Sequence, residues 1–384
     1  MSCDLGAKFI ELARTLKRIM LRTNSLRGVE KFLRVISINL LSPFVYKSSE
    51  RRDDFYFLYG GIGDVLTDFY LINRYTSECN QKITVLIPTE VYQMLHALQT
   101  NVSMIEYRAN NLFTVVQTLN RLKPKGVNFV VHKLSLERIV VCMMLGMRSS
   151  HGYLKNQSTI YLNGTIVTKP IEINFNRYEL VSYVLEKRYG PLERKKTSQR
   201  VNEFTSVGLM LTKSADRGAS LHDNIDFWDS VLQGLSGSVK KCRDIFIFGE
   251  AYAIDTARYI EKRLLELGSS ANLYNYVGEI TLSKVFAMLP NLSHIIALDS
   301  GLSNMARFNE KPTLAVYTHT DPISFNWPSH ESLYNKRYAC MPCIRESNAP
   351  LDNYPVICNH DFRCKHSLIA SDVTQAVRLF LERN

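Results

Sequence analysis

The stretch FYFLYGGIGDVLTDFYLINRYT, residues 55–76, joins an apolar run to a helix-like segment through three glycines within four residues. A short apolar run that passes into an amphipathic stretch is typical of a strand followed by a helix. Glycine at such a turn permits positive φ angles and a close approach of the backbone to a ligand. One carboxylate, Asp64, stands where the helix begins. Its residue type favours a helix cap, and a functional role remains open.

The same strand-then-helix pattern recurs along most of the chain. Expected strands of a first half are 54–59, 83–88, 102–107 and 128–133, and those of a second half are 206–211, 244–249, 270–277, 293–299 and 313–317. Short apolar runs that alternate with amphipathic helices predict parallel sheets with crossover connections. We therefore expect an α/β chain with two doubly wound domains, 53–190 and 206–384, joined by a polar linker at 191–205.

Residues 1–52 form a basic segment of different character. They contain eleven Lys/Arg and four Asp/Glu, so most of the net charge of +11 resides there. Apolar residues recur at helical spacing between the charges, which predicts a basic amphipathic helical extension. Such a helix can lie on an anionic lipid surface, or it can pack on the first domain and leave a solvated basic rim. The segment lacks the interleaved aromatic residues of a nucleic-acid site.

The composition fits a globular protein, with 46% hydrophobic and 22% charged residues. No stretch approaches the roughly 18 uninterrupted apolar residues of a membrane-spanning helix. The sequence does not open on a secretory signal. We therefore expect a cytoplasmic protein, which the basic extension could hold at the inner membrane.

A second strand-to-helix turn lies near the other end of the chain. The sequence IIALDSGLSNMARFNEKPTLAVY, residues 295–317, predicts a strand, a turn at Asp299-Ser300-Gly301, a short helix and another strand. Backbone N–H groups at a helix start suit a diphosphate. A carboxylate is unfavourable beside phosphate, so Asp299 is expected to bind a ribose or sugar hydroxyl, with a simple cap as the alternative.

Together, GGIGD at residues 60–64 and DSGLSNMA…KPTLAVYTHTDP at residues 299–322 resemble motifs of the ADP-heptose:lipopolysaccharide heptosyltransferase family. The resemblance covers roughly residues 54–384. It implies an inverting glycosyltransferase of the GT-B fold, in which two Rossmann-like domains face a cleft. It also implies transfer of heptose from ADP-heptose, a nucleotide-sugar donor, to a lipopolysaccharide core acceptor.

The resemblance assigns roles to individual residues. It makes Asp64 the general base, while Gly60, Gly61 and Gly63 let donor and acceptor approach it. Donor contacts are expected from the ends of several strands of the second half: Thr212, Lys213, Arg217, Glu250, Asp255, Glu279, Ile280, Asp299, Ser300, Gly301, Leu302, Ser303 and Asn304. Arg217, or Lys213 close to it, would neutralise the diphosphate, so catalysis requires no metal or other cofactor.

Several of these assignments carry alternatives. Both cations can be exposed loop charges, Ile280 can be core packing, and the ribose acid can be either Glu250 or Asp255. The sequence also departs from the family where Asn304 replaces the usual His, since Asn never carries a positive charge. This difference puts the identity of the donor in question more than the class of reaction.

Four of the eight cysteines lie in one segment, residues 340–364. Cys340 and Cys343 form a C-x2-C pair, and Cys358 and Cys364 follow. This spacing is typical of a tetrahedral metal site that would hold structural zinc or iron. Thiols without metal and disulfides are the alternatives, of which disulfides are disfavoured in the cytoplasm.

Two other functions are compatible with the sequence. The same fold could use another nucleotide sugar or modify a protein, and screening ADP-, UDP- and GDP-sugars separates these possibilities. A degenerate, non-catalytic module that only binds glycan or nucleotide is the other. The presence of Asp64, Arg217 and Asp299 argues against that module.

Overall fold

The computed structural model describes residues 54–58, 60–80, 82–108, 149–151, 165–167, 177–191, 205–212, 221–239, 242–327, 330–335, 337–341 and 360–383. The extension at 1–52, the strand expected at 128–133 and nearly all of the linker lie outside these residues. The domain boundaries given above therefore stay predictions. No helix among the described residues is long and apolar enough to cross a membrane.

The first half is built on a parallel sheet of the order β1-β2-β3. Its elements are β1 (Asp54–Phe57), α3 (Ile62–Cys79), β2 (Ile83–Pro88), α4 (Thr89–Leu95) and β3 (Val102–Tyr107), followed by β4 (Ser149–His151), β5 (Thr165–Val167) and α7 (Arg177–Tyr189). Strands β4 and β5 pair with each other in parallel. The buried strand residues are apolar, so burial against α3 stabilises the sheet.

The second half holds a six-stranded, wholly parallel sheet of the order β11-β10-β9-β6-β7-β8. Its strands are β6 (Ser206–Met210), β7 (Asp244–Phe248), β8 (Asn272–Asn275), β9 (His294–Leu298), β10 (Thr313–Val316) and β11 (Glu331–Leu333). Its α-helices are α8 (Ile225–Val239), α9 (Ile254–Glu266), α10 (Leu282–Met288), α11 (Gly301–Phe308), α12 (Pro322–Phe325) and α13 (Ala370–Arg383). Single 3₁₀ turns occur at η3 (Ala251–Ala253), η4 (Leu289–Asn291) and η5 (Arg363–His366).

This strand order confirms the doubly wound prediction for the second half. The chain winds outward from β6 through β7 to β8, then returns to the other side of β6 with β9, β10 and β11. The direction of winding reverses between β6 and β9, and ligands of such sheets bind at the carboxyl ends of the strands beside that reversal. Thr212 follows β6 and Asp299 follows β9, so both stand at the reversal.

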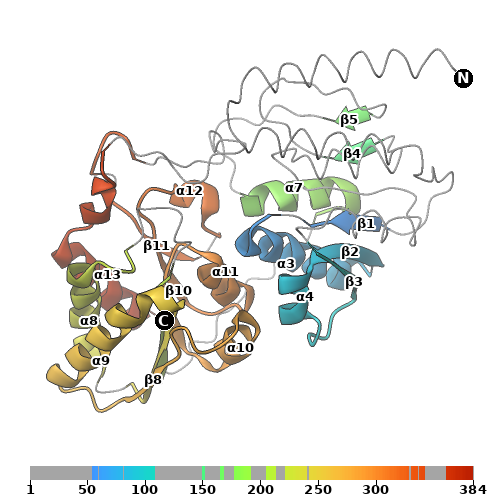
Figure 1. Cartoon of the computed structure of the whole chain (residues 1–384). Coiled ribbons are helices and arrows are strands. Elements are labelled where there is room, and N and C mark those ends of the chain that lie inside the picture. Colours follow the sequence, from blue (N-terminus) through green and yellow to red (C-terminus); the bar gives the residue numbers. More distant parts are fainter. Residues whose placement is uncertain are drawn as a thin grey trace, which may run out of the picture.

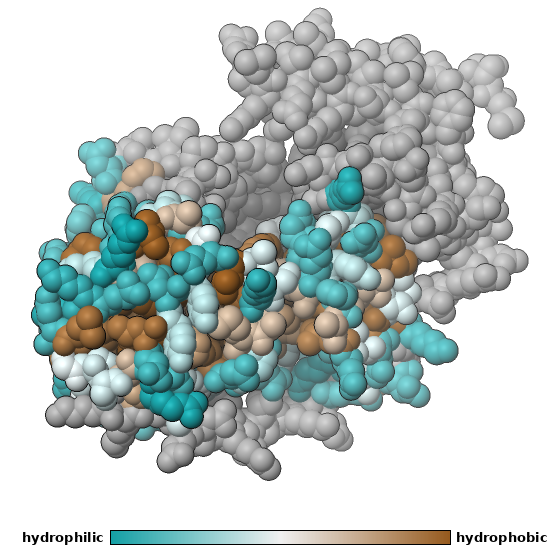
Figure 2. All heavy atoms as spheres, turned by 60° about the horizontal axis from the view of Figure 1, so that its bottom comes forward, coloured by the Kyte–Doolittle hydropathy of each residue, from teal (hydrophilic) through white to brown (hydrophobic). Residues whose placement is uncertain are grey.

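The two halves meet through helices, as Figure 1 shows where α10 and α11 face α4 and α3. One apolar cluster contains side chains from α3 and the first sheet together with side chains from α10, α11 and β9. Phe308 at the end of α11 lies against Phe69 and Tyr70 of α3. The surface in Figure 2 shows hydrophobic side chains interspersed with hydrophilic ones over the described atoms of this face. Many of the apolar residues in the cluster that joins the halves are buried.

Candidate active site

The turn after β1 places Asp64 by means of glycines. Gly60 has a φ of +138°, a value that side chains rarely tolerate. A Cβ built on Gly60 would lie 2.8 Å from Oδ2 of Asp64, closer than real contacts allow. The N–H of Gly61 donates to the same Oδ2 at 3.2 Å. The carboxylate is therefore held in the first turn of α3, where it caps the helix and is half-buried.

The second turn places Asp299 differently. Asp299 precedes the N-cap residue, Ser300, and is only 8% exposed. Its Oδ2 accepts a hydrogen bond from the hydroxyl of Thr320, and its N–H donates to the carbonyl of Val316 at 2.9 Å. Ser303 closes the start of α11, since its Oγ accepts from Ser300 N–H at 3.2 Å and donates to Ser300 O at 2.8 Å. Helix capping therefore falls to the serines, and the carboxylate of Asp299 faces the end of β10.

The structure brings the two turns together, although more than 230 residues separate them in the sequence. Gly63 lies against the side-chain amide of Asn304, and a Cβ at Gly63 would overlap that amide. A Cβ on Gly301 would lie 3.4 Å from Cβ of Ile62. The glycines thus allow the N-termini of α3 and α11 to meet. A site bounded by Asp64 on one helix and by Asn304 on the other follows from this contact.

A tryptophan from the second half fixes the same junction one turn further along α3. Nε1 of Trp327 donates to the hydroxyl of Thr67 at 3.1 Å, and Thr67 donates to the carbonyl of Gly63 at 2.8 Å. Trp327 also packs on Tyr70 of α3 and Tyr178 of α7. Hydrogen bonds and aromatic packing together tie the second half to the helix that carries Asp64.

Thr212, at the end of β6, lies beside the turn that follows β7. Thr212 is buried, and Tyr252 lies close to its hydroxyl. Partial burial raises the pKa of Tyr252 to about 12, and the nearby carboxylate of Glu250 adds to the rise. Tyr252 also stands edge-on to the ring of His222. The sequence analysis predicted Thr212 and Glu250 as site residues here. It did not predict Tyr252 or His222.

The turns after β7 and β8 lie side by side. The N–H of Gly278 donates to the carbonyl of Gly249 at 2.9 Å, which brings Glu279 near Glu250, and both carboxylates are exposed. Asp255 stands apart on the first turn of α9, with a 94% exposed side chain 3.8 Å from Arg258. Glu250 therefore lies at the strand-end turn and Asp255 on the surface of α9, and the identity of the ribose acid stays a prediction. Ile280 is half-buried against the cluster that joins the halves, as its core-packing interpretation requires.

Lys213 and Arg217 lie outside the described residues, so their role at the diphosphate stays a prediction. Leu302 and Ser303 are buried in the first turn of α11.

Comparison with known proteins assigns part of the chain to a family. Residues 241–353 match the family model described as glycosyltransferase family 9 (heptosyltransferase). The chain carries a family 9 glycosyltransferase domain. The resemblance inferred from the two motifs is confirmed, and with it the class of enzyme, a glycosyltransferase.

Solved structures show the same fold over most of the chain. The glycosyl transferase family 9 protein from Veillonella parvula has a TM-score of 0.61 at 12% identity, over 88% of this chain and all of that one (100%). The E. coli heptosyltransferase WaaC with ADP has a TM-score of 0.54 at 15% identity, over 86% and 98%. E. coli ADP-heptose lps heptosyltransferase II gives 0.53 at 13%, over 86% and 99%. The GT-B prediction is confirmed, whereas a search of curated protein sequences gave no significant match.

The family 9 domain also contains polar residues that the sequence prediction missed at the carboxyl end of β10. Tyr317 and Thr320 lie there, next to the end of β9, and Arg307 reaches Tyr317 from α11. Position at a strand end of a parallel sheet was the available signal for Tyr317 and Thr320. Arg307 follows Asn304 by three residues, so the helical period places both on one face of α11.

The predicted metal site is described in part. Cys340 and Cys364 belong to one small apolar cluster with Met341 and Phe362, so the two ends of the cysteine segment come together. Cys343 and Cys358 lie outside the described residues. Within the described ranges, no three His, Cys, Asp or Glu side chains are placed to hold a metal ion.

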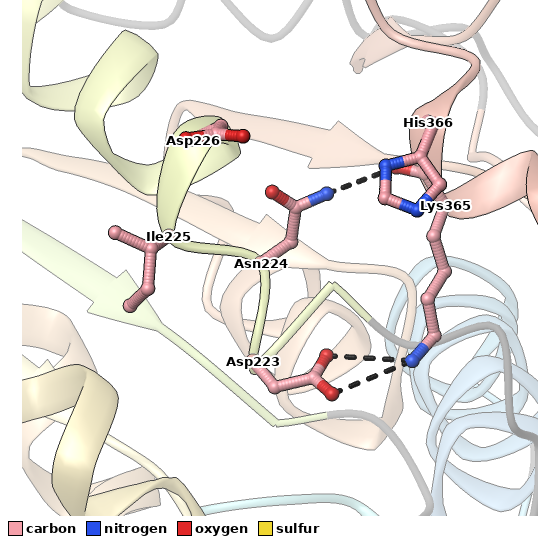
Figure 3. Close-up of a pocket in the computed structure, with 6 residues that line it drawn as sticks. All are labelled: Asp223, Asn224, Ile225, Asp226, Lys365 and His366. Carbon is pink, nitrogen blue, oxygen red and sulfur yellow. Dashed lines mark hydrogen bonds and ion pairs between the residues drawn. The ribbon is translucent and has the colours of Figure 1, made fainter.

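A hollow of about 320 Å³ lies at the start of α8, lined by none of the predicted site residues. Figure 3 shows Lys365 reaching the carboxylate of Asp223, with Nζ 3.4 Å from each oxygen, while the amide of Asn224 donates to the Lys365 carbonyl at 3.1 Å. Oδ1 of Asn224 also accepts from the N–H of Phe227 at 3.0 Å. These contacts attach the η5 turn to the start of α8, so the hollow is a structural seam between these two segments.

Proposed function

We propose that this glycosyltransferase transfers heptose from ADP-heptose to a lipopolysaccharide core acceptor with inversion at the anomeric carbon. The observation that carries the proposal is the contact between Gly63 and Asn304. It joins the motif that holds the proposed base to the motif that would hold the donor. Structural neighbours described as heptosyltransferases with ADP support the choice of donor class.

In the proposed reaction, Asp64 takes the proton of the acceptor hydroxyl. The acceptor oxygen forms a bond to the anomeric carbon while the bond from that carbon to the diphosphate oxygen breaks, and ADP leaves with the electron pair. A base on one side and stabilisation of the leaving charge on the other suffice for this single displacement. The N-terminus of α11 presents N–H groups to the anion, with Arg217 and Lys213 as the proposed cations.

Asp299 is proposed to bind a hydroxyl of the donor. Its buried position beside Thr320 keeps the carboxylate oriented, because a hydrogen-bonded carboxylate cannot swing toward solvent without losing that partner. Glu250 is proposed to bind the ribose, since it stands at the end of β7 beside Thr212 and Tyr252. Both residues would thus accept hydrogen bonds from sugar hydroxyls.

The decisive experiment is a transfer assay with ADP-heptose and a heptose-deficient lipopolysaccharide acceptor, followed by mass analysis of the product. We expect a gain of one heptose with the wild-type protein and none with Asp64→Asn. Glu106→Gln, which alters an exposed acid on β3, is the matched control. Binding of ADP without transfer to any acceptor would support the non-catalytic module instead.

A different donor remains the second candidate, because Asn304 stands where the family usually carries His. The assay is therefore repeated with UDP- and GDP-sugars and with protein acceptors. Transfer from one of these, and none from ADP-heptose, would replace the proposed donor while preserving the class of reaction.

The charge role of Arg217 has its own test. Arg217→Ala should weaken binding of ADP more than binding of adenosine, because only ADP carries the diphosphate. Equal losses for both ligands would remove Arg217 from the phosphate site.

We also propose that Cys340, Cys343, Cys358 and Cys364 hold a structural zinc or iron ion. The proximity of Cys340 and Cys364 in one apolar cluster supports the proposal, and one structural neighbour is described as iron-containing. Metal analysis should find about one ion per chain, lost in Cys340→Ser and retained in Cys242→Ser. A metal-free native protein would contradict the proposal.

A further inference from the structure

Arg307 is a buried cation at the junction of the two helices. It is 1% exposed, on the last turn of α11. Nη2 donates to the hydroxyl of Tyr317 at 3.0 Å, and Nη1 makes a long hydrogen bond of 3.5 Å to Oδ1 of Asn304. Its buried Nε has no hydrogen-bond partner among the described residues. No carboxylate among the described residues lies within ion-pair distance of the Arg307 guanidinium. Burial of a charge without an ion-pair partner costs desolvation free energy, so a functional role for Arg307 is worth testing.

The two titratable rings beside Arg307, those of Tyr317 and His330, carry no negative charge. Burial raises the pKa of Tyr317 well above its ordinary value, so the phenol stays neutral although Arg307 opposes the rise. Burial and the charge of Arg307 together lower the pKa of His330 to about 3, so the imidazole is neutral at physiological pH. Neither ring therefore carries a negative charge that would pair with the guanidinium, and the carboxylates that act on Tyr317, those of Asp299 and Asp321, form no ion pair with Arg307.

The polar group that this charge orients is the side chain of Asn304. A guanidinium only donates hydrogen bonds, so it attracts the carbonyl Oδ1 and repels the NH₂ group of the amide. Nδ2 consequently points the other way, where it donates to Ser300 O at 3.1 Å. Only one of its two hydrogens is used in that bond. Nδ2 also lies where a Cβ of Gly63 would be, one residue before Asp64.

We infer that Arg307 is a positioning residue that locks the Asn304 amide, so that Nδ2 presents an N–H beside Asp64 to a sugar oxygen of the substrate. The inference rests on the proposed function. It gives Asn304 a role that needs no charge of its own, because the charge stands one helical turn behind it. Arg307 orients the donor group and does not itself touch the substrate.

The first test uses Asn304→Asp, which keeps the shape and replaces the NH₂ group by oxygen. The new carboxylate would pair with Arg307, so the melting temperature should hold or rise, while kcat falls at least tenfold because the N–H donor is lost. Wild-type kcat in this variant would overturn the inference.

The second test removes the charge. Arg307→Met should lower kcat about tenfold with little change in KM, Arg307→Lys should restore part of it, and Arg378→Met, an exposed arginine on α13, should change neither. Arg307→Lys and Asn304→Ala should be less than additive in kcat/KM, since both act through one amide. Additive losses would show that the two residues act independently and would overturn the inference.

A readout that does not depend on activity separates the inference from the proposed function. The side-chain ¹⁵N resonance of Asn304, assigned by its absence in Asn304→Asp, should shift in Arg307→Lys while the fold is retained. An unmoved resonance would overturn the positioning role even in an active enzyme. Absence of transfer by the wild-type protein with every donor, with a shifted resonance, would instead sink the proposed function alone.

Discussion

Asp64 and Asp299 occupy matching places in the two halves, each after a parallel strand and before a helix, yet their environments differ. Asp64 is half-buried inside the first turn of α3 and caps it through Gly61. Asp299 is buried, stands before the cap of α11 and bonds Thr320 on the neighbouring strand end. The carboxylate of Asp64 hydrogen-bonds at the start of its own helix, whereas that of Asp299 hydrogen-bonds to a residue that follows the neighbouring strand of the sheet. This difference agrees with the roles proposed above, in which Asp64 exchanges a proton and Asp299 holds a ligand.

Asp64→Asn tests the reactive side of the comparison and should give the largest effect. Asparagine keeps the size and can still accept the hydrogen bond from Gly61, but it cannot take a proton. We expect kcat to fall on the order of 10²–10⁴-fold, the usual reach of general-base catalysis, with little change in melting temperature. Steady-state kinetics and calorimetry measure both. Near-normal turnover would remove Asp64 as the base.

Asp299→Ala tests the ligand-holding side. It removes the proposed contact to the donor and the carboxylate that accepts from the Thr320 hydroxyl. Loss of one buried, charge-assisted hydrogen bond should weaken donor binding by about 1–3 kcal/mol, roughly tenfold to a hundredfold. Titration calorimetry with the active nucleotide sugar measures it. Thr320→Val is the companion variant and should cost less, because the carboxylate remains. Unchanged donor affinity in Asp299→Ala would contradict the assignment.

Gly60→Ala tests how strongly the first turn depends on its backbone. A side chain at a φ of +138° is strained and would collide with Asp64. We expect a loss of about 1–3 kcal/mol in the free energy of unfolding, together with reduced kcat. Gly237→Ala on α8, where a Cβ meets nothing within 4 Å, should instead stabilise by about 0.5–1 kcal/mol. Equal effects in urea unfolding would show that the turn is not constrained.

Acid should destabilise the second half of the chain, because His294 and His330 have lowered pKa values there. Burial lowers the pKa of His294 to about 4 and that of His330 to about 3, below the unfolded value of about 6.5. As pH falls, the unfolded chain takes up protons first, so stability is lost from about pH 6.5 downward. Each histidine contributes a slope of up to about 1.4 kcal/mol per pH unit. In urea titrations from pH 7 to 5, His294→Gln should flatten the slope, whereas the exposed His366→Gln should not. An unaltered slope in His294→Gln would refute this source of acid sensitivity.

The smallest effect on turnover is expected from deletion of residues 1–50. This basic extension is proposed to hold the enzyme at an anionic membrane, where each Lys or Arg near the surface contributes about 1 kcal/mol. Turnover on a short soluble acceptor should stay largely intact, while binding to anionic vesicles falls. Full-length binding should weaken as salt rises, because charge screening shortens the interaction. A truncated protein that is insoluble or inactive on every acceptor would show that the segment covers the first domain instead.

The sequence determined the local elements and the two strand-to-helix turns that contain Asp64 and Asp299. Strands 83–88 and 102–107 were predicted with the observed bounds, because short apolar runs between turn residues leave few alternatives. Both Asp turns were also predicted as strand-to-helix turns, because glycine follows or interrupts the end of an apolar run in each case. The resemblance that these turns supported correctly indicated the family.

Only the tertiary structure decided how those turns meet and which groups surround them. That Gly63 lies against Asn304 depends on the packing of α3 on α11 through one apolar cluster, a contact between residues 241 positions apart that local periodicity cannot encode. The same packing buries Arg307 beside Asn304, joins Trp327 to Thr67 and places Glu250, not Asp255, next to Thr212. Strand and helix periods follow from backbone geometry within a few residues. The partners of a polar side chain follow from the fold as a whole, because burial removes water and leaves only the groups that folding brings near.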